Sequence, residues 1–286
     1  MLHQSSWDVE KHSFPWEADA HRVREERLQT LLMNLSESHR SGDSIVHVIW
    51  SAGCAGFNAN QSQTSTELKT FNQVASFAAS VKTSLGSRSH FHMLSSAGGL
   101  FEGVRGINLT TKPCPARLYG QLKAEQEAIA IDATTSSCSI YRPTSVYSTV
   151  QRGKRCGLIP TVIWNSLLNQ TTSIYGNNDT LRDYIWADDI GRFIAGRLAD
   201  SVALTGHQTY LLATAVPTPI NRIVRLIEDM LMRPVPLRFI APLDKNTRDI
   251  TVSASAIPPG LVRTDLATAI RQIYLRLLSQ GVVAYG

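Results

Sequence analysis

The sequence is poor in cysteine and has no long apolar run. Its four cysteines, Cys54, Cys114, Cys138 and Cys156, form no CxxC pair and have no histidine at metal-ligand spacing. This pattern argues against a disulfide framework and against a zinc site. No apolar stretch reaches the length of a membrane span, and the first residues show neither the basic start nor the apolar segment of a signal peptide. We therefore expect a protein that is not exported, has no membrane partner and lies in the reducing cytoplasm.

The net charge is only mildly basic. Lys and Arg total 28 against 23 for Asp and Glu, which gives a formal charge of +5 and a pI near 9.1. Such an excess suits a small anionic ligand but is spread too thinly for a nucleic-acid-binding surface. The eight histidines, among them His90 and His92, show no HExxH or similar spacing. We expect them on strand faces or at the surface, with no bound metal.

Apolar runs and helical patterns alternate over the first 150 residues. Helical spacing covers 18–35, 67–84 and the segment ARLYGQLKAEQE, whereas SIVHVIWSAG, HFHMLSSAGG and SCSIYRPTSVY have the character of buried strands. This alternation predicts an α/β protein with a parallel sheet and helices on its faces. Ligands of such sheets bind at the carboxyl ends of the strands, where the small-residue turns at 51–53 and 95–98 would lie.

The second half of the chain consists of shorter elements. We expect a helix in GLIPTVIWNSLL, short strands around SIYG and RDYIW, a helix over 190–198 and a strand in HQTYLLAT. Two more helices follow, one capped by Thr218 or Asn221 and one by Thr264 or Asp265. We interpret residues 1–150 as the sheet domain, to which about 176–200 returns, and residues 151–286 mainly as a smaller cap domain.

Tyr119 and Lys123 are one helical turn apart in ARLYGQLKAEQE. Residues at i and i+4 share a helix face, so the phenol and the ammonium can converge on one small volume. A phenol is a poor base at neutral pH, and a nearby cation favours the phenolate. The spacing therefore suits a proton-transfer pair, although the same spacing also occurs in helices as an ordinary solvated pair.

Several motifs accompany this pair in a fixed order. Ser95 and Ser96 end a strand before it, and RPTSVY and RDYIWADDI follow it. The ordered set resembles the extended short-chain dehydrogenase/reductases, that is, the NAD-dependent epimerase/dehydratase family acting largely on nucleotide sugars, over roughly residues 45–278. The resemblance implies a Rossmann-like doubly wound parallel sheet with a smaller C-terminal substrate-binding domain. It also implies NAD or NADP as cofactor, a nucleotide-sugar substrate, and a homodimer that pairs through the tyrosine helix.

The resemblance further implies a role for individual residues. Tyr119 would be the general acid or base, Lys123 would assist it and contact the nicotinamide ribose, and Ser96 would polarise the same substrate oxygen, with Ser95 as the alternative register. The implied cofactor contacts are Ala52, Gly53, Lys123, Pro143 and Val146, and the implied diphosphate-binding arginines are Arg182 and Arg248. Strand-end capping, tight packing and surface ion pairing stay open as alternatives for the serines, the small residues and Arg248.

Asp188 and Asp189 are adjacent carboxylates in RDYIWADDI. Adjacent side chains do not normally converge, so we interpret one of them as the cap of a helix that begins at Ile190 and not as an acid/base pair.

The sequence has no GxxGxxG segment, which in this family cradles the dinucleotide pyrophosphate at a helix amino terminus. Only Gly42 precedes Ile45. The resemblance thus implies a truncated form without the first strand, the first helix and much of the second strand. A start codon assigned too late, a truncated product and a divergent paralogue without a cofactor all stay open as explanations.

Three functional hypotheses follow. The first is an NAD(P)-dependent epimerase or reductase that acts on a nucleotide sugar. A 4,6-dehydratase is disfavoured, because Ala97 and Gly98 stand where that subgroup carries Asp-Glu. The second is a non-catalytic remnant of the fold with weak or no cofactor binding. The third is a reductase of a substrate that is not a nucleotide.

Overall fold

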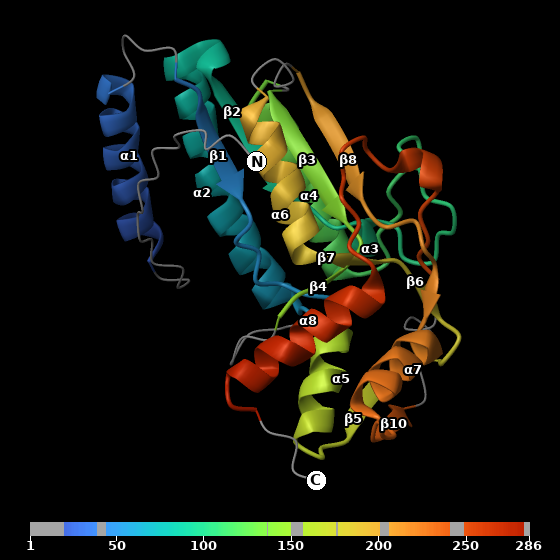
Figure 1. Cartoon of the computed structure of the whole chain (residues 1–286). Coiled ribbons are helices and arrows are strands. Elements are labelled where there is room, and N and C mark those ends of the chain that lie inside the picture. Colours follow the sequence, from blue (N-terminus) through green and yellow to red (C-terminus); the bar gives the residue numbers. More distant parts are fainter. Residues whose placement is uncertain are drawn as a thin grey trace. The chain divides into compact units, whose positions relative to one another are not determined.

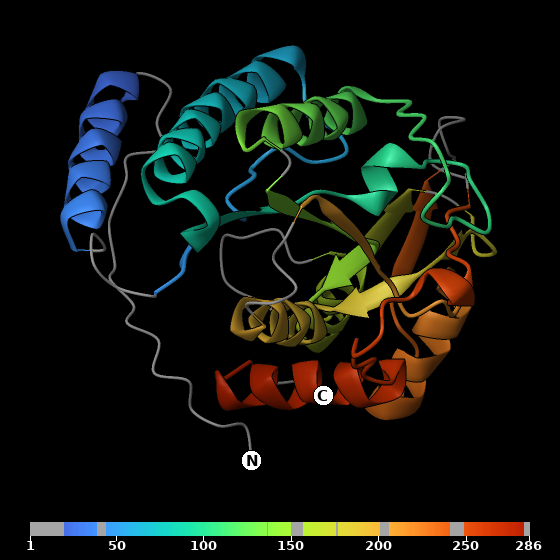
Figure 2. The ribbon, with the colours of Figure 1, turned by 90° about the horizontal axis from the view of Figure 1, so that it is seen from above.

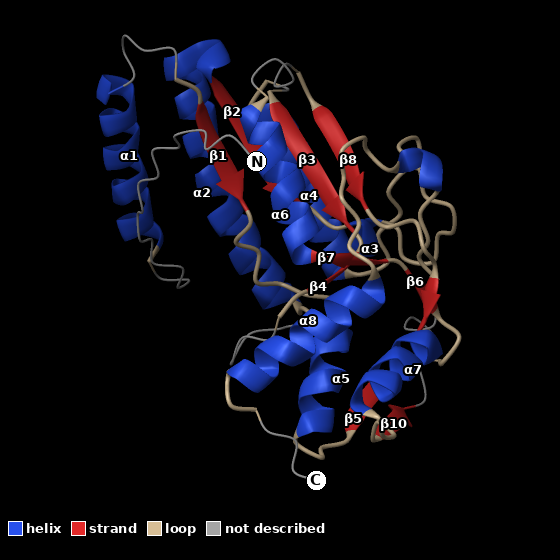
Figure 3. Cartoon of the chain, viewed as in Figure 1, coloured by secondary structure: helices blue, strands red, loops and turns tan. Residues whose placement is uncertain are grey.

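The structure is a computed structural model of the chain, and it describes residues 20–38, 44–135, 137–149, 157–175, 177–200, 206–240 and 249–282. Helices and strands alternate along the chain (Figures 1 and 3). The contacts divide the chain into two compact units. The first comprises the described residues up to Ser95, then Pro115–Tyr141 and Ile194–Thr209, and the second comprises Ser96–Cys114, Arg142–Phe193 and the described residues from Tyr210 onward.

A four-stranded sheet has the order β1-β2-β3-β8. Its strands are β1 (Val46–Trp50), β2 (Ser89–Leu94), β3 (Cys138–Pro143) and β8 (Gln208–Leu212). The pairs β1·β2 and β2·β3 are both parallel, with Val46 opposite Ser89 and Phe91 opposite Cys138. The parallel sheet predicted from the alternating pattern is thereby confirmed.

Two helices cover one face of the sheet in the first unit. These are α2 (Gln61–Leu85) and α4 (Leu118–Ala133), which lie side by side on one face of the sheet (Figure 2). Side chains that alternate along the strands point at these helices, because successive residues of a strand face opposite sides. The resulting core includes Trp50, Phe71, Phe91, Met93 and Ile140.

A third helix, α1 (His21–Ser38), packs on α2 through Leu28, which contacts a cluster containing Phe77 and Val81. The predicted helix at 18–35 is thus confirmed. The helix predicted at 67–84 is longer than expected, because α2 already begins at Gln61. Asn60 and Gln63 form a reciprocal capping box there, which satisfies backbone N–H groups of the first turn.

The other face of these three strands is polar. His47 Nδ1 lies 3.1 Å from His92 Nε2, and His92 Nδ1 lies 2.9 Å from the Tyr141 hydroxyl, so one hydrogen-bonded chain crosses β1, β2 and β3. His90 is paired with Ser139 at 2.9 Å. The expected strand-face location of His90 and His92 is confirmed, since both are buried.

Burial keeps the His92 imidazole, in the middle of this hydrogen-bonded series, uncharged. It lowers the pKa of His92 to about 2, with smaller contributions from His90 and His47. Burial also lowers the pKa of His47. Protonation of His92 or His47 is therefore unfavourable in the folded protein.

The second unit contains three small strand pairs and its own helical core. β4 (Ser145–Tyr147) pairs in parallel with β7 (Tyr184–Trp186), and β5 (Thr172–Tyr175) pairs in parallel with β10 (Leu237–Ile240). β6 (Leu181–Arg182) is antiparallel to β9 (Thr218–Pro219). The helices are α3 (Ala97–Leu100), α5 (Leu158–Leu167), α7 (Ile220–Leu231) and α8 (Leu266–Ser279), and α6 (Ala187–Ala199) begins in this unit. Apolar side chains of α5, α7 and α8 form the core.

Two of the predicted helix starts in this unit are wrong. α7 has Pro219 at its cap position and no side-chain cap, because Thr218 belongs to β9 and donates its hydroxyl to the Val216 carbonyl. α6 begins at Ala187, so Asp188 and Asp189 lie inside its first turn. The third start is confirmed, since Asp265 caps α8 by accepting the Thr268 N–H.

In the described ranges, every helix is too short or too polar to cross a membrane. Cys54, Cys114 and Cys138 are free thiols, and Cys156 lies outside the described residues.

We predict that acid destabilises the histidine face. The folded-state pKa of His92 lies below its unfolded value of about 6.5, so on acidification the unfolded chain binds a proton that the folded protein does not. The stability that depends on neutral His92 is therefore complete above about pH 6.5 and is lost as the pH falls. For His92 the expected loss between pH 7 and pH 5 is about 2 kcal/mol. Urea unfolding at several pH values measures it, and His92→Gln should flatten the dependence. The exposed His21→Gln is the control, and equal pH dependence in the two variants would contradict the account.

Candidate active site

The structure brings Tyr119 and Lys123 together. Both lie in the first two turns of α4, with Tyr119 half-buried and Lys123 buried. Lys123 Nζ is 5.7 Å from the centroid of the Tyr119 ring, which is within the range of a cation–π contact. The geometry is therefore that of an ammonium close to an accessible phenol.

The other side of the Tyr119 ring is also ordered. The Phe57 ring centroid lies 5.6 Å from the Tyr119 centroid, and the Arg117 guanidinium is 5.5 Å from the Phe57 centroid. Within the described part of the chain, the Tyr119 hydroxyl forms no hydrogen bond. The ring is thus held by its neighbours while the hydroxyl stays available to a ligand.

Lys123 is tied to a buried carboxylate. Its Nζ donates to Glu67 Oε1 and to Gln126 Oε1, each at 2.9 Å, and Gln126 Nε2 donates to Glu67 Oε1 at 3.1 Å. Burial by itself would raise the pKa of Glu67, but Lys123, the Ala55 N–H and Gln126 outweigh it and hold that pKa below its ordinary value. The Glu67 carboxylate is therefore ionised at neutral pH.

The turn after β1 closes over the same pair. Glu67 Oε2 accepts the N–H groups of Cys54 at 2.8 Å and Ala55 at 2.6 Å. A Cβ atom at Gly53 would lie 3.0 Å from Glu67 Oε1 and 3.0 Å from Lys123 Nζ. Ala52 and Gly53 were predicted as small residues that let a cofactor approach. In the structure Gly53 has its close contact with the ion pair, and Ala52 is exposed.

The two candidate serines differ in their surroundings. Ser96 Oγ accepts the Gly99 N–H at 3.1 Å and caps α3. Ser95 is 6% exposed, and its Oγ has no hydrogen-bond partner among the described residues. Its backbone N–H donates to the Tyr141 carbonyl in β3. Ser95 belongs to the same unit as Tyr119 and Lys123, whereas Ser96 belongs to the second unit.

The remaining predicted residues lie in the second unit or outside the described residues. Pro143 is buried at the end of β3, and Val146 in β4 is 41% exposed. Arg182 pairs with Thr218 across β6 and β9, and its Nη1 donates to the Leu181 carbonyl at 3.2 Å. Arg248 lies outside the described residues.

Two further carboxylates have structural partners. Asp189 is buried and accepts both the N–H and the hydroxyl of Thr264, at 2.7 and 2.8 Å, besides pairing with Arg192. Asp183 accepts the N–H of Thr214 at 2.8 Å and that of Val216 at 3.1 Å. These contacts hold the segments before α7 and α8, and they engage the carboxylates of Asp183 and Asp189.

Sequence reasoning missed Glu67 and Gln126. Gln126 is three residues after Lys123, and this spacing alone places both on one helix face. Glu67 interrupts the buried stripe of α2 that includes Phe71, Ala75 and Ala78. A charged residue within the buried face of a helix is the sequence signal that could have identified Glu67, because a buried carboxylate requires a partner.

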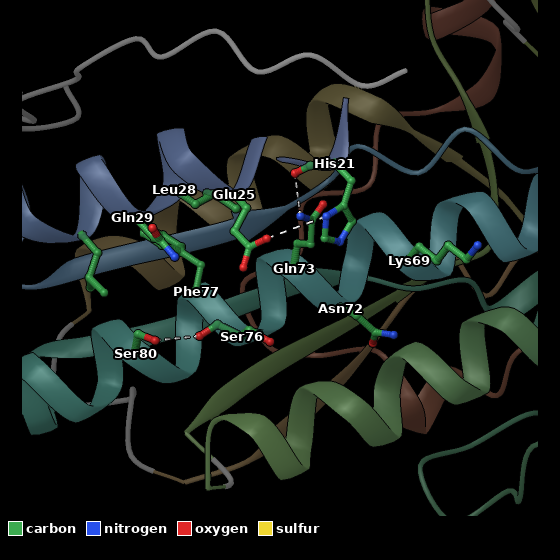
Figure 4. A pocket seen from close by; sticks show the side chains of 11 residues that line it. His21, Glu25, Leu28, Gln29, Lys69, Asn72, Gln73, Ser76, Phe77 and Ser80 are labelled. Carbon is green, nitrogen blue, oxygen red and sulfur yellow. Dashed lines mark hydrogen bonds and ion pairs between the residues drawn. The ribbon is translucent and has the colours of Figure 1, made fainter. Parts of the chain in front are cut away.

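A groove of about 720 Å³ lies elsewhere, between α1 and α2 (Figure 4). His21, Glu25 and Gln29 line it from α1, and Lys69, Asn72 and Gln73 line it from α2. Some of its polar groups bind one another, as when Gln73 Nε2 donates to the His21 carbonyl at 3.0 Å. No predicted site residue is among the described residues that line this groove. Nowhere in the described ranges do three metal-ligating side chains converge.

Comparisons with known proteins identify a family and a shared fold. The model of the NAD dependent epimerase/dehydratase family matches residues 6–212. A search of curated sequences found no match. Among solved structures, MoeE5 in complex with UDP-glucuronic acid and NAD is 19% identical, with a TM-score of 0.73 over 88% of this chain and 84% of that one.

Two UDP-glucose 4-epimerases are also similar. The enzyme of Stenotrophomonas maltophila, with bound NAD and formylated UDP-arabinopyranose, is 16% identical, with a TM-score of 0.75 over 92% of this chain and 87% of that one. The enzyme of Thermotoga maritima, with UDP-glucose, is 17% identical, with a TM-score of 0.70 over 89% and 83%. At these identities the likeness shows a shared fold.

We predict that Gly53→Ala strains the ion pair. The new methyl group would lie 3.0 Å from both charged atoms, which are fixed by further hydrogen bonds. The expected loss is about 1–3 kcal/mol in urea unfolding. Gly191→Ala in α6 is the control, since its methyl group would meet no atom within 4 Å. Equal stability of Gly53→Ala and the wild type would refute the close contact.

Proposed function

Because the chain belongs to the NAD dependent epimerase/dehydratase family, we propose that it is an NAD(P)-dependent epimerase or reductase of a nucleotide sugar. The observation that carries the proposal is the accessible Tyr119 phenol, whose hydroxyl is unbonded within the described residues, beside the buried Lys123 ammonium 5.7 Å from its ring. In this proposal Tyr119 exchanges a proton with a sugar hydroxyl, and the neighbouring cation stabilises the phenolate.

Ser95 supports the same chemistry. Its buried Oγ lacks a partner among the described residues, and an unsatisfied buried hydroxyl is unfavourable unless a ligand bonds to it. We propose that Ser95, and not Ser96, polarises the reacting sugar oxygen, because Ser96 already caps α3.

The described residues fit the ribose end of a nicotinamide cofactor. An ammonium has three N–H donors, and Lys123 directs two of them to Glu67 and Gln126, which leaves one for a ribose hydroxyl. We propose Ala52, Gly53, Pro143 and Val146 as further cofactor contacts. When bound, the nicotinamide supplies hydride transfer. The sequence has no GxxGxxG cradle for the pyrophosphate, and we assign no residue to that part.

For the substrate we propose the two arginines of the sequence analysis. A guanidinium suits a diphosphate, because its planar fork donates two parallel hydrogen bonds. Arg182 and Arg248 would then bind the diphosphate of a nucleotide sugar. The solved structures with UDP-sugars support this substrate class, because they share the fold.

A non-catalytic remnant of the fold is the second candidate. The absence of a GxxGxxG segment from the sequence favours it. A titration of NADH fluorescence separates the candidates: saturable binding supports the enzyme, and no binding supports the remnant.

We predict that Tyr119→Phe strongly lowers turnover without unfolding the protein. The hydroxyl forms no hydrogen bond within the described residues, so thermal stability should change little, whereas the loss of the acid/base group should lower kcat about 10²- to 10⁴-fold. Turnover of a panel of UDP- and GDP-sugars with NAD or NADPH measures the effect. Tyr274→Phe in α8 is the control. Wild-type activity in Tyr119→Phe would rule out Tyr119 as the acid or base.

We predict opposite effects for the two serines. Ser95→Ala should lower kcat at least about tenfold, because a donor to the reacting oxygen is lost, with stability unchanged to within about 0.5 kcal/mol. Ser96→Ala removes the cap of α3 and should cost about 1 kcal/mol of stability with little change in kcat. Assays of turnover and thermal unfolding compare them. The reverse pattern would return the role to Ser96.

A further inference from the structure

Glu67 connects three segments of the first unit through one buried carboxylate. The side chain lies on α2 and is 2% exposed. Its Oε1 accepts from Lys123 and Gln126 of α4, and its Oε2 accepts the N–H groups of Cys54 and Ala55 in the turn after β1. All four donors lie within 3.1 Å of a carboxylate oxygen. Each oxygen of the buried carboxylate therefore accepts two hydrogen bonds.

Stability alone does not account for such a pair. Removing two charges from water is costly, and apolar side chains of similar volume often stabilise a protein as well or better. The rest of the buried stripe of α2 is made of apolar or uncharged side chains such as Phe71 and Ala75. A carboxylate at this point thus has a positional effect that an apolar residue would not supply.

The first positional effect is on Lys123. A lysine side chain has many rotamers, and fixing it carries an entropic cost. The contacts to Glu67 and Gln126 select one placement, in which Nζ is 5.7 Å from the Tyr119 ring centroid. They also leave a single N–H donor unassigned, so the direction in which Lys123 can bind a ligand is restricted.

The second positional effect is on the turn at 53–55. Two consecutive N–H groups converge on Glu67 Oε2, which fixes the backbone immediately after Gly53. Gly53 in turn has no side chain where a Cβ atom would approach Lys123 Nζ to 3.0 Å. One carboxylate therefore sets the distance between this turn and the ammonium.

We propose that Glu67 is a positioning residue, which aligns the Lys123 ammonium and the turn at 53–55 for one and the same ligand, the ribose end of the nicotinamide cofactor. The inference rests on the proposed function for the identity of that ligand. The alignment itself rests only on contacts within the first unit.

Three variants of the full-length chain test the proposal. Glu67→Gln keeps the shape and removes the charge, and an amide offers only one oxygen to the donors that now bind two. Glu67→Asp keeps the charge but shortens the side chain by one methylene group, which moves the carboxylate away from its donors. Glu125→Gln removes a charge from the exposed face of the same α4 helix and serves as the matched control.

The first measurement is amide hydrogen exchange of the cofactor-free protein. In Glu67→Gln the N–H groups of Cys54 and Ala55 should exchange about tenfold faster or more, while Glu125→Gln should match the wild type. Unchanged exchange in Glu67→Gln would overturn the proposed alignment, whether or not the protein is an enzyme.

The second measurement separates positioning from a merely structural role. In Glu67→Gln the Kd for NADH should rise about tenfold and kcat should fall by a similar factor, while the KM for the nucleotide sugar stays within about twofold. Glu67→Asp should recover part of both losses. Faster exchange with wild-type NADH binding and kcat would overturn the proposal and leave Glu67 a structural residue. Absence of NADH binding in the wild type would instead refute the proposed function, and the exchange measurement alone would then decide the alignment.

Discussion

The buried ion pair between Glu67 and Lys123 fixes the relative positions of α2, α4 and the turn after β1 in the first unit. Each charge is satisfied by the other and by neutral donors or acceptors, so neither can be removed without leaving an uncompensated group inside the protein. The pair joins α2 and α4, which lie on the same face of the sheet, and it holds the turn that leaves β1. Tyr119 gains its position from the same helix, one turn before the lysine.

This arrangement explains why residue 53, after β1, is a glycine. Sequence reasoning assigned Gly53 to close approach by a cofactor, and the structure shows a different close neighbour, the ion pair itself. For the two serines after β2, too, the structure supplies information that the sequence does not contain. Their sequence is compatible with either register, and only the hydrogen bond from Gly99 to Ser96 shows which hydroxyl is already used. The buried Oγ of Ser95 has no hydrogen-bond partner among the described residues.

Much of the fold could be predicted from the sequence, because local patterns determine it. Alternation of apolar runs with helical spacing predicts the parallel sheet, and the i, i+4 spacing places Tyr119 and Lys123 on one face of α4. Features set by tertiary contacts could not be predicted in this way. Glu67 is far from Lys123 along the chain, so only the packing of α2 on α4 brings them to 2.9 Å. The start of α7 also depends on tertiary structure, since the pairing of β9 with β6 takes Thr218 away from the cap.

The most direct test of the account is a double-mutant cycle between Glu67 and Lys123. Glu67→Gln, Lys123→Met and the double variant would be compared with the wild type by urea unfolding at pH 7. The account predicts that each single change destabilises the protein strongly and that the double change costs less than their sum, with a coupling free energy of about 2 kcal/mol or more. Effects that add to within about 0.5 kcal/mol would show that the two side chains do not depend on each other, and would contradict it.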